Sequence, residues 1–300
     1  MWKWISRIVI SLAVLVLAVK AADRLARRGG ALPAIPQPNG YDTLLAVAGK
    51  VSAPHGDLAD LGPDAIRQVA QTNRANLESL HEALRTETGV PLQIEPRWVD
   101  KHAEDVKKLK RLAVVLAIQS KAELLNGNTN NSATCLLDVI LLGQALARGG
   151  LLSDGINALA VETIGAASLR AQVPYLDAGF CRSAGQELER SEARREQPGR
   201  ILKTEKDWSA ASFGLVSQVG GLFLRKAEAQ RRAGFTGRYQ ETIRRTRRLM
   251  LIMAARAVEL ETGQRVLSPS GLVPGVLKSV PLDPETNTPM TDIPVAVNER

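Results

Sequence analysis

The side chains that most often perform chemistry are few in this chain, and they are scattered. Its three histidines are His55, His81 and His102. A metal or acid/base site needs such residues in a cluster, for example as H-E-x-x-H on one helix face, and no such pair occurs. Each histidine is therefore predicted to be a surface or capping residue.

Two carboxylates fall within apolar stretches, at Asp138 and Glu162. A buried carboxylate is costly unless it is paired, so we expect each to contact Arg148 or Arg170. If the protein is an enzyme whose site cannot be recognised from one sequence, that site would be built on Asp138, Glu162 or His102. No serine-nucleophile, Walker A or dinucleotide-binding motif is present, and no catalytic residue, metal or cofactor is predicted.

A basic stretch runs from Arg225 to Arg256. It holds ten basic residues and two glutamates, which accounts for the whole net charge of +8. Such a local field favours an anionic partner (lipid headgroups, nucleic acid or an acidic protein), and the alternative is a solvated helix face. The candidate anion-binding residues are Arg238, Arg244, Arg245, Arg247 and Arg248.

The two cysteines, Cys135 and Cys181, each lie in an apolar, helix-forming stretch. They show no C-x-x-C and no metal-ligand spacing. A free buried cysteine behaves as a small hydrophobic residue. Free thiols are the favoured interpretation, and a disulfide between the two is the alternative.

The elements that must position these residues are helices. Only 4% of the residues are aromatic, and alanine and leucine, which favour helix, are abundant. Apolar residues recur at three- and four-residue spacing between proline and glycine breaks, which predicts an all-α bundle or a short α-solenoid. The predicted helices cover residues 41–51, 63–88, 98–125, 134–147, 155–172, 177–197, 215–233 and 236–261.

Three of these helices differ in character. The helix over 134–147 has almost no polar side, which predicts burial all round at the centre of the body. The helix over 177–197 is rich in charge and is predicted to be exposed. The helix over 155–172 carries an apolar side made of Ile156, Leu159, Ala160, Thr163, Ile164 and Ala167.

The N-terminus contains an uncharged stretch from Ile8 to Val19. These residues have the length of a signal-peptide core, with a weak cleavage site after Ala21. The whole segment 2–22 is long enough for an uncleaved transmembrane anchor, since about 20 helical residues cross the hydrocarbon core. The uncleaved anchor is preferred to cleavage, and a buried soluble helix is the third alternative.

The flanking charges give a weak indication of orientation. Lys3 and Arg7 precede the apolar stretch, while Lys20, Arg24, Arg27 and Arg28 follow it. By the positive-inside rule these charges favour a cytoplasmic body or are neutral, whereas the very short N-terminal tail and the signal-like apolar core favour a body outside the cytoplasm. The body is placed outside the cytoplasm, on the periplasmic side, which would argue against a nucleic-acid partner. The predicted organisation is an anchor and basic flank over 1–28, a Pro/Gly linker over 29–40, a helical domain over 41–265 and an irregular tail over 266–300.

Two segments carry a resemblance. The stretch from Ala122 to Gly127 followed by Leu141 to Gly150 (AELLNG … LLGQALARGG) resembles a set of membrane-anchored helical proteins of bacteria. The tail from Leu272 to Met290 (LVPGVLKSVPLDPETNTPM) fits that set and is similar to the ending of major pseudopilins. The pseudopilin processing signature is absent from the N-terminus, so the tail is interpreted as a turn and packing motif.

The tail resemblance implies one further hypothesis. Pseudopilin tails can hold calcium, which makes Asp283, Glu285 and Asn287 candidate oxygen ligands here. A calcium site needs 6–8 oxygens. The five prolines of the tail exclude a long helix, so it must cross the surface of the body as turns or trail free.

Three functions remain open at this point. The leading hypothesis is a membrane-tethered helical interaction or scaffold protein of the bacterial cell envelope. This hypothesis predicts a stable protein partner and an exposed apolar groove or face, with residues 2–22 inserted in the bilayer. The alternatives are an electrostatic binder of anionic lipid or nucleic acid through Arg225–Arg256 and an enzyme with a hidden site.

Overall fold

The structure is a computed structural model that describes residues 16–24, 31–54, 60–95, 97–217 and 225–294. Within these ranges the regular structure is helical, and the only strand-like pairing is an isolated bridge between Leu282 and Pro289. The predicted all-α class is confirmed. The helices are α2 (Gly40–Lys50), α3 (Pro63–Leu77), α4 (Leu80–Arg85), α5 (Trp98–Leu125), α6 (Thr129–Ala147), α7 (Leu152–Gln172), α8 (Ala178–Ala193), α9 (Pro198–Phe213) and α11 (Arg225–Thr262), with short 3₁₀ turns at Val173–Tyr175 and Pro269–Leu272.

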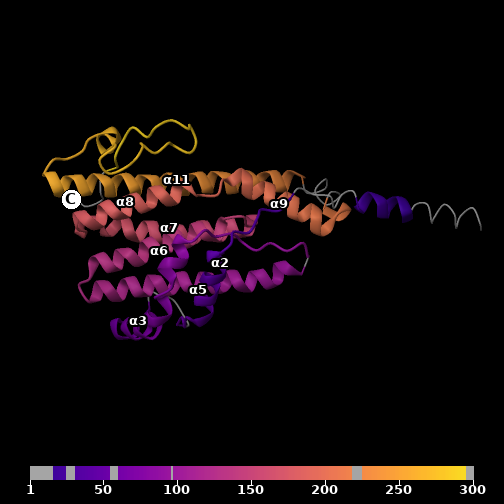
Figure 1. The fold of residues 1–300 in the computed structure, drawn as a ribbon, viewed down its shortest axis with the longest axis horizontal. Helices are drawn as coiled ribbons and strands as arrows, with labels where there is room; N and C mark the ends of the chain where they lie inside the picture. Colours follow the sequence, from indigo (N-terminus) through magenta and orange to yellow (C-terminus); the bar gives the residue numbers. More distant parts are fainter. Residues whose placement is uncertain (1–15, 25–30, 55–59, 96, 218–224, 295–300) are drawn as a thin grey trace, which may run out of the picture.

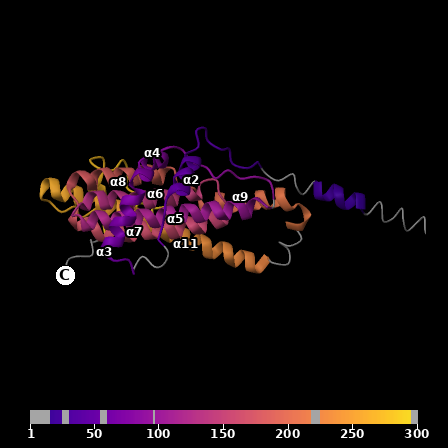
Figure 2. The same ribbon diagram turned by 90° about the horizontal axis from the view of Figure 1, so that it is seen from below.

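The long helices form an elongated bundle in which they pack side by side, some as chain neighbours and some across intervening helices (Figure 1). α5 packs on α6, α6 on α7, and α8 on α11, while α3 covers the outer side of α5. Figure 2 shows α2 and α4 lying across the bundle rather than along it. α6 is the centre of this arrangement, because every residue from Leu136 to Ala147 is buried, as its composition predicted.

Two glycines let α6 and α7 approach each other closely. A methyl group at Gly143 would lie 2.8 Å from the Glu162 amide nitrogen and 2.9 Å from the Ala158 carbonyl oxygen. One at Gly165 would lie 2.9 Å from the Leu136 carbonyl oxygen. All three distances are shorter than van der Waals contact, so this helix pair requires glycine at both positions.

The structure corrects several predicted helix boundaries. α9 was not predicted, because Pro198 was interpreted as a break; proline is tolerated in the first turn of a helix, where Pro198 stands. The predicted break at 233–236 is wrong, since α11 runs without interruption through that point. The predicted helix over 63–88 is divided into α3 and α4, and the predicted helix over 215–233 lies partly outside the described residues.

The tail crosses the surface of the bundle as turns, which was one of the two predicted arrangements. Leu272, Val276, Leu277 and Met290 are buried and belong to the same apolar core as the long helices. Figure 1 shows this segment lying along α11. α11 ends at Thr262, and the packed body continues beyond it into the tail.

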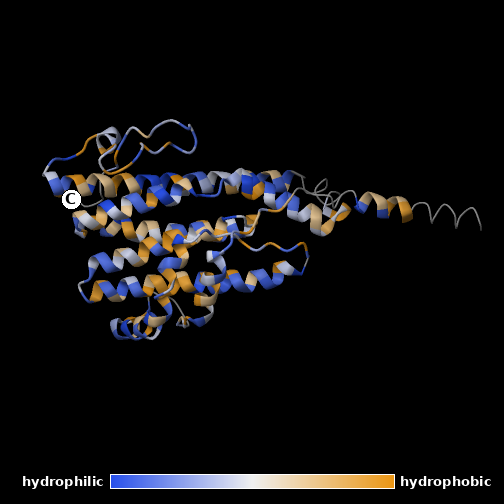
Figure 3. Ribbon diagram, in the orientation of Figure 1, coloured by the Kyte–Doolittle hydropathy of each residue, from blue (hydrophilic) through white to orange (hydrophobic). Residues whose placement is uncertain are grey.

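The predicted anchor over residues 2–22 lies mostly outside the described residues. Residues 16–24 are helical and project beyond the end of the bundle, coloured orange for hydrophobic over part of their length (Figure 3). In the part of the chain that is described, no helix combines the length and the hydropathy that crossing a bilayer requires.

Candidate functional site

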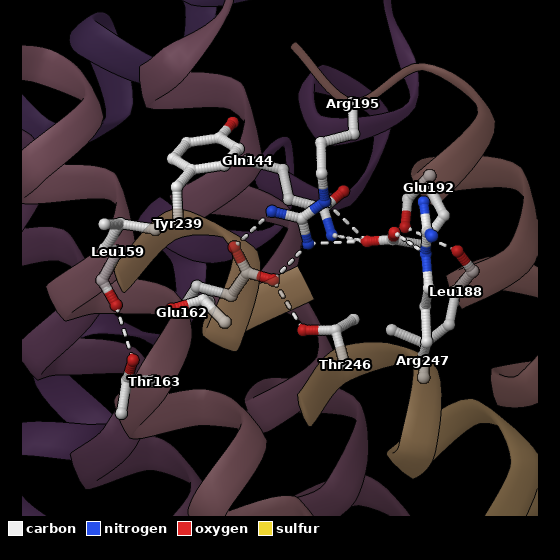
Figure 4. Close-up of polar contacts among 12 residues, drawn as sticks. Gln144, Leu159, Glu162, Thr163, Leu188, Glu192, Arg195, Tyr239, Thr246 and Arg247 are labelled. Atoms are coloured by element: carbon white, nitrogen blue, oxygen red, sulfur yellow. Dashed lines mark hydrogen bonds and ion pairs between the residues drawn. The ribbon is translucent and has the colours of Figure 1, made fainter. Parts of the chain in front are cut away.

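A network of buried charged side chains lies in the core between α7, the end of α8 and α11 (Figure 4). The Glu162 carboxylate accepts two hydrogen bonds from the Arg195 guanidinium, one of them 2.8 Å from Nη1 to Oε2. Thr246 Oγ1 donates a third at 2.6 Å. The Glu162 and Arg195 side chains are 1% and 2% exposed, so this bidentate pair is fully withdrawn from water.

Glu192 extends the network toward the surface. It accepts a hydrogen bond from Arg195 Nε at 2.6 Å and one from Arg247 Nε at 3.0 Å. Burial opposes the charge of Arg195, but the Glu162 and Glu192 carboxylates outweigh it and raise the pKa of Arg195. Two carboxylates and two guanidinium groups thus neutralise one another, and the arrangement holds α7, α8 and α11 in register.

The expected partners of Glu162 and Asp138 were wrong in detail. Glu162 pairs with Arg195 and not with Arg148 or Arg170, and Asp138 Oδ1 lies 3.1 Å from Nδ1 of His81. Structural pairing of both carboxylates was nevertheless the right interpretation. Arg195 was not singled out, because the charged segment 177–197 was predicted to be exposed and its last residues turn inward instead.

The two histidines in the described ranges, His81 and His102, each contact one carboxylate. His102 is buried, contrary to prediction: its Nε2 lies 2.7 Å from Asp154 Oδ1, and its ring stacks on Trp98. His81 is partly exposed and contacts Asp138. His55 lies outside the described residues. His102, Asp138 and Glu162 each bond to a different partner, so the structure does not join them into one acid/base constellation.

The basic stretch is largely used inside the molecule. Arg244 holds the tail, with Nε 2.8 Å from Asp283 Oδ2 and Nη2 2.8 Å from Glu285 Oε2. Arg247 bonds to Glu192 and to the carbonyl oxygen of Leu282. The anion-binding role of these residues stays a prediction, but much of their charge is neutralised by carboxylates of the same chain.

The remaining candidates differ in exposure. Arg245 pairs with Glu241 at 2.8 Å and is exposed. Arg238 is exposed and bonds within its own helix to the carbonyl oxygen of Gly234. Arg248 is half-buried, and its Nε has no hydrogen-bond partner among the described residues. Arg238 and Arg245 are therefore the members of the predicted set most accessible to an external anion.

The candidate calcium ligands Asp283 and Glu285 do come together, at Arg244. The guanidinium supplies the positive charge that a bound cation would have supplied. The backbone N–H of Asn287 donates to the carbonyl oxygen of Asp283 within the turn, so its contact belongs to the fold of the tail. Arg244 and the two carboxylates form a clamp for the tail. Over the described residues, no group of three or more His, Cys, Asp or Glu side chains could hold a metal ion.

Replacing Arg244 by Gln is expected to loosen the tail, because it removes both tail carboxylate contacts. A partly exposed ion pair contributes up to about 1 kcal/mol, so thermolysin should cut the segment around Leu282 roughly fivefold faster. The control is Arg245→Gln, which removes a neighbouring cation whose one ion pair within the described ranges is with Glu241. Equal cutting rates in the two variants would contradict the clamp.

The same contact should depend on pH. Hydrogen bonds from Arg244 and from the amides of Glu285 and Thr286 hold the pKa of Asp283 below its ordinary value of 3.8. Because this pKa is lowered by folding, the contribution is complete above pH 3.8 and declines as the pH falls toward the lowered value. Proteolysis of the tail should therefore accelerate at acid pH in the wild type and much less in Arg244→Gln, and a pH-stable acid protease measures it.

The outward side of α7 is uncharged. Its exposed residues are Ser153, Ile156, Ala160, Ile164, Ala167, Ser168 and Ala171, and exposed Tyr175 follows in the next turn. We refer to Ile156, Ala160, Ile164, Ala167 and Ala171 as the α7 face. Their four- and three-residue spacing places them along one side of the helix. Ile164 is 52% exposed.

Four of the six residues that the sequence grouped on one side of this helix therefore point outward. Thr163 is partly exposed and only Leu159 is buried. The opposite side of α7 is apolar as well, with Ala158, Val161 and Leu169 buried. A helix with two apolar sides gives no periodic signal of which side faces inward.

Both cysteines are free thiols. Burial raises the pKa of Cys135 and of Cys181 to about 12 in each case, so neither is a thiolate at neutral pH. The favoured interpretation is thus confirmed, and neither thiol has the electropositive, accessible surroundings of a nucleophile.

Comparison with known proteins adds no relative. No family model, curated protein or solved structure matches this chain. The resemblance of the helix hairpin and the tail to membrane-anchored bacterial proteins stays a prediction. The feature of the described chain that its internal contacts leave unexplained is the α7 face.

Proposed function

We propose that this chain is a membrane-tethered interaction protein of the bacterial cell envelope, and that it docks an apolar helix of a partner protein on the α7 face. The observation that carries the proposal is the uncharged outward side of α7, a helix of 21 residues. A helix at the surface of a soluble domain normally turns charged residues toward water. An exposed apolar surface marks a site of interaction.

The composition of the face supports a helix as the partner. Alanine at positions 160, 167 and 171 leaves little side-chain bulk, which allows two helices to approach closely, and Ile156 and Ile164 supply apolar area to bury. Asp154 and Glu162, the acidic residues of α7, are both buried, so neither presents a charge to the partner. Arg170, at the end of the helix, is half-buried.

The tether is the sequence-based part of the proposal. Residues 2–22 carry the uncharged stretch Ile8–Val19, and the described portion of this segment exposes Val16, Leu17 and Val19. Leu17 is 66% exposed, which favours an apolar environment for this helix outside the bundle. The linker over 29–40 would then separate the body from the bilayer, on the periplasmic side if the predicted orientation holds.

Site-specific photo-crosslinking in the native host tests the docking face. A photoreactive residue in place of Ile164 should give a discrete adduct with a partner protein, and one in place of Arg111, exposed on α5, should not. Ala160→Glu, one turn away on the same face, should abolish the adduct because it buries a charge in the interface. An adduct that survives Ala160→Glu, or equal yields from both positions, would contradict the proposal.

A further inference from the structure

A separate cleft lies between the end of α4, the C-terminal half of α8 and the tail. Its volume is about 730 Å³, and its wall contains four cations (Arg85, Arg190, Arg194 and Lys278) and two carboxylates (Glu187 and Glu189). Small-molecule sites commonly measure about 300–1,000 Å³. The cleft therefore has room for a ligand, and the question is which of its charges are available.

Both carboxylates are used by internal contacts. Glu187 is buried and pairs with Arg190, three residues along the same helix. Glu189 Oε1 accepts hydrogen bonds from the backbone amides of Lys278 at 2.8 Å and Ser279 at 3.2 Å. Glu189 thus fixes the tail in place, and its charge is directed at the tail backbone instead of at the neighbouring cations.

Three cations at the cleft remain without a carboxylate. Arg85, Arg194 and Lys278 are exposed and form no ion pair with any residue of the described ranges. Arg194 Nη1 lies 3.3 Å from the carbonyl oxygen of Arg85, which brings the two arginines together at one edge of the cleft. Like charges held in this way repel one another, and an anion between them would relieve that repulsion.

Arg148, a buried residue near the cleft, is affected by the positive charge of Arg194. The pKa of Arg148 is lowered to about 10, first by burial and then by the charges of Arg194 and Arg195. Its Nε has no hydrogen-bond partner among the described residues. The charge of Arg194 therefore reaches this buried guanidinium, although the Glu196 carboxylate opposes its effect.

We propose that this cleft binds a compact polyanion, a small molecule with two or more phosphate or carboxylate groups, through Arg85, Arg194 and Lys278. Two guanidinium groups suit such ligands because each presents paired donors to an anionic oxygen pair. Among the described residues, no aromatic side chain lines the cleft and Ala193 is its one apolar side chain, so the described wall recognises charge and not an aromatic or apolar group. This site is distinct from the α7 face and does not depend on the proposed docking function.

Calorimetric titration of the full chain with pyrophosphate at low ionic strength tests the proposal. The wild type should bind saturably with one site per chain, and the double variant Arg85→Gln/Arg194→Gln should bind about tenfold to a hundredfold more weakly. All three cations are exposed, so these substitutions should leave folding intact, which circular dichroism verifies. The matched control is Lys110→Gln/Arg111→Gln, which removes two exposed cations from α5 without touching the cleft.

Three outcomes would overturn the proposal. The first is no saturable heat with millimolar pyrophosphate, and the second is an equal loss of affinity in the α5 control, which would indicate a general effect of net charge. The third is tighter binding of an octaglutamate peptide than of pyrophosphate at the same site, which would replace the small anion by an acidic protein segment. Binding that needs Arg85 and Arg194, and that the control retains, would support it.

Discussion

Replacing Arg195 by Met is expected to lower the free energy of unfolding by about 3–5 kcal/mol, because it leaves two carboxylates in the core without their shared partner. Glu162 loses its bidentate contact and Glu192 loses one of its two guanidinium neighbours. Methionine fills much of the same volume, so the loss reports on charge more than on packing. Urea unfolding followed by circular dichroism measures it.

The adjacent residue provides the control. Arg194 is exposed, so Arg194→Met should change stability by less than about 0.5 kcal/mol. Adding Glu162→Gln to Arg195→Met should recover part of the loss, since it removes the carboxylate left unpaired. Similar stabilities for Arg194→Met and Arg195→Met would show that the network contributes nothing to the bundle.

Replacing Gly143 by Ala is expected to destabilise the bundle, although it adds only one methyl group. That methyl would lie 2.8 Å from the Glu162 amide nitrogen, and the obstacle is backbone that cannot rotate away. Overpacking of this kind costs about 1–3 kcal/mol. The same unfolding measurement should therefore show a less stable protein despite the better helix propensity of alanine.

Replacing Gly234, inside α11, by Ala is expected to have the opposite effect and raise the free energy of unfolding. A methyl group there meets nothing within 4 Å, and alanine should stabilise the helix interior by about 0.5–1 kcal/mol. A neutral Gly143→Ala would contradict the close approach of α6 and α7. A destabilising Gly234→Ala would contradict the open space around that glycine in α11. The pair separates tertiary contact from helix propensity within one protein.

Helix type and central burial were predictable because they depend on local pattern. The bounds of α5 follow from the apolar spacing after Trp98 and the Asn-Gly pair that ends it, and the predicted residues 98–125 agree with the structure. The burial of α6 follows from its lack of a polar side. Both signals lie within one segment of sequence and need no knowledge of the neighbours.

The ion-pair partners, the helix that begins at Pro198 and the direction of the α7 face could not be predicted, because they depend on contacts between residues distant in sequence or on ambiguous local signals. Glu162 meets Arg195 across 33 residues, and Arg244 meets Asp283 across 39, and no local pattern specifies either pair. The meaning of a proline in the sequence was also ambiguous, since Pro198 could mark either the end of one helix or the first turn of the next. Ile156 and Ile164 point outward because the opposite side of α7, which includes Ala158, Val161 and Leu169, packs on the core.

The size of the native complex tests the interaction function most directly. The chain has a mass of 32.4 kDa, and after gentle solubilisation from the native host the wild type should sediment in a larger assembly. Ile164→Glu should shift it to the size of the single chain, while Lys110→Glu, on exposed α5, should leave the assembly unchanged. If the wild type and Ile164→Glu sediment identically, the α7 face does not bind a partner and the proposed function is wrong.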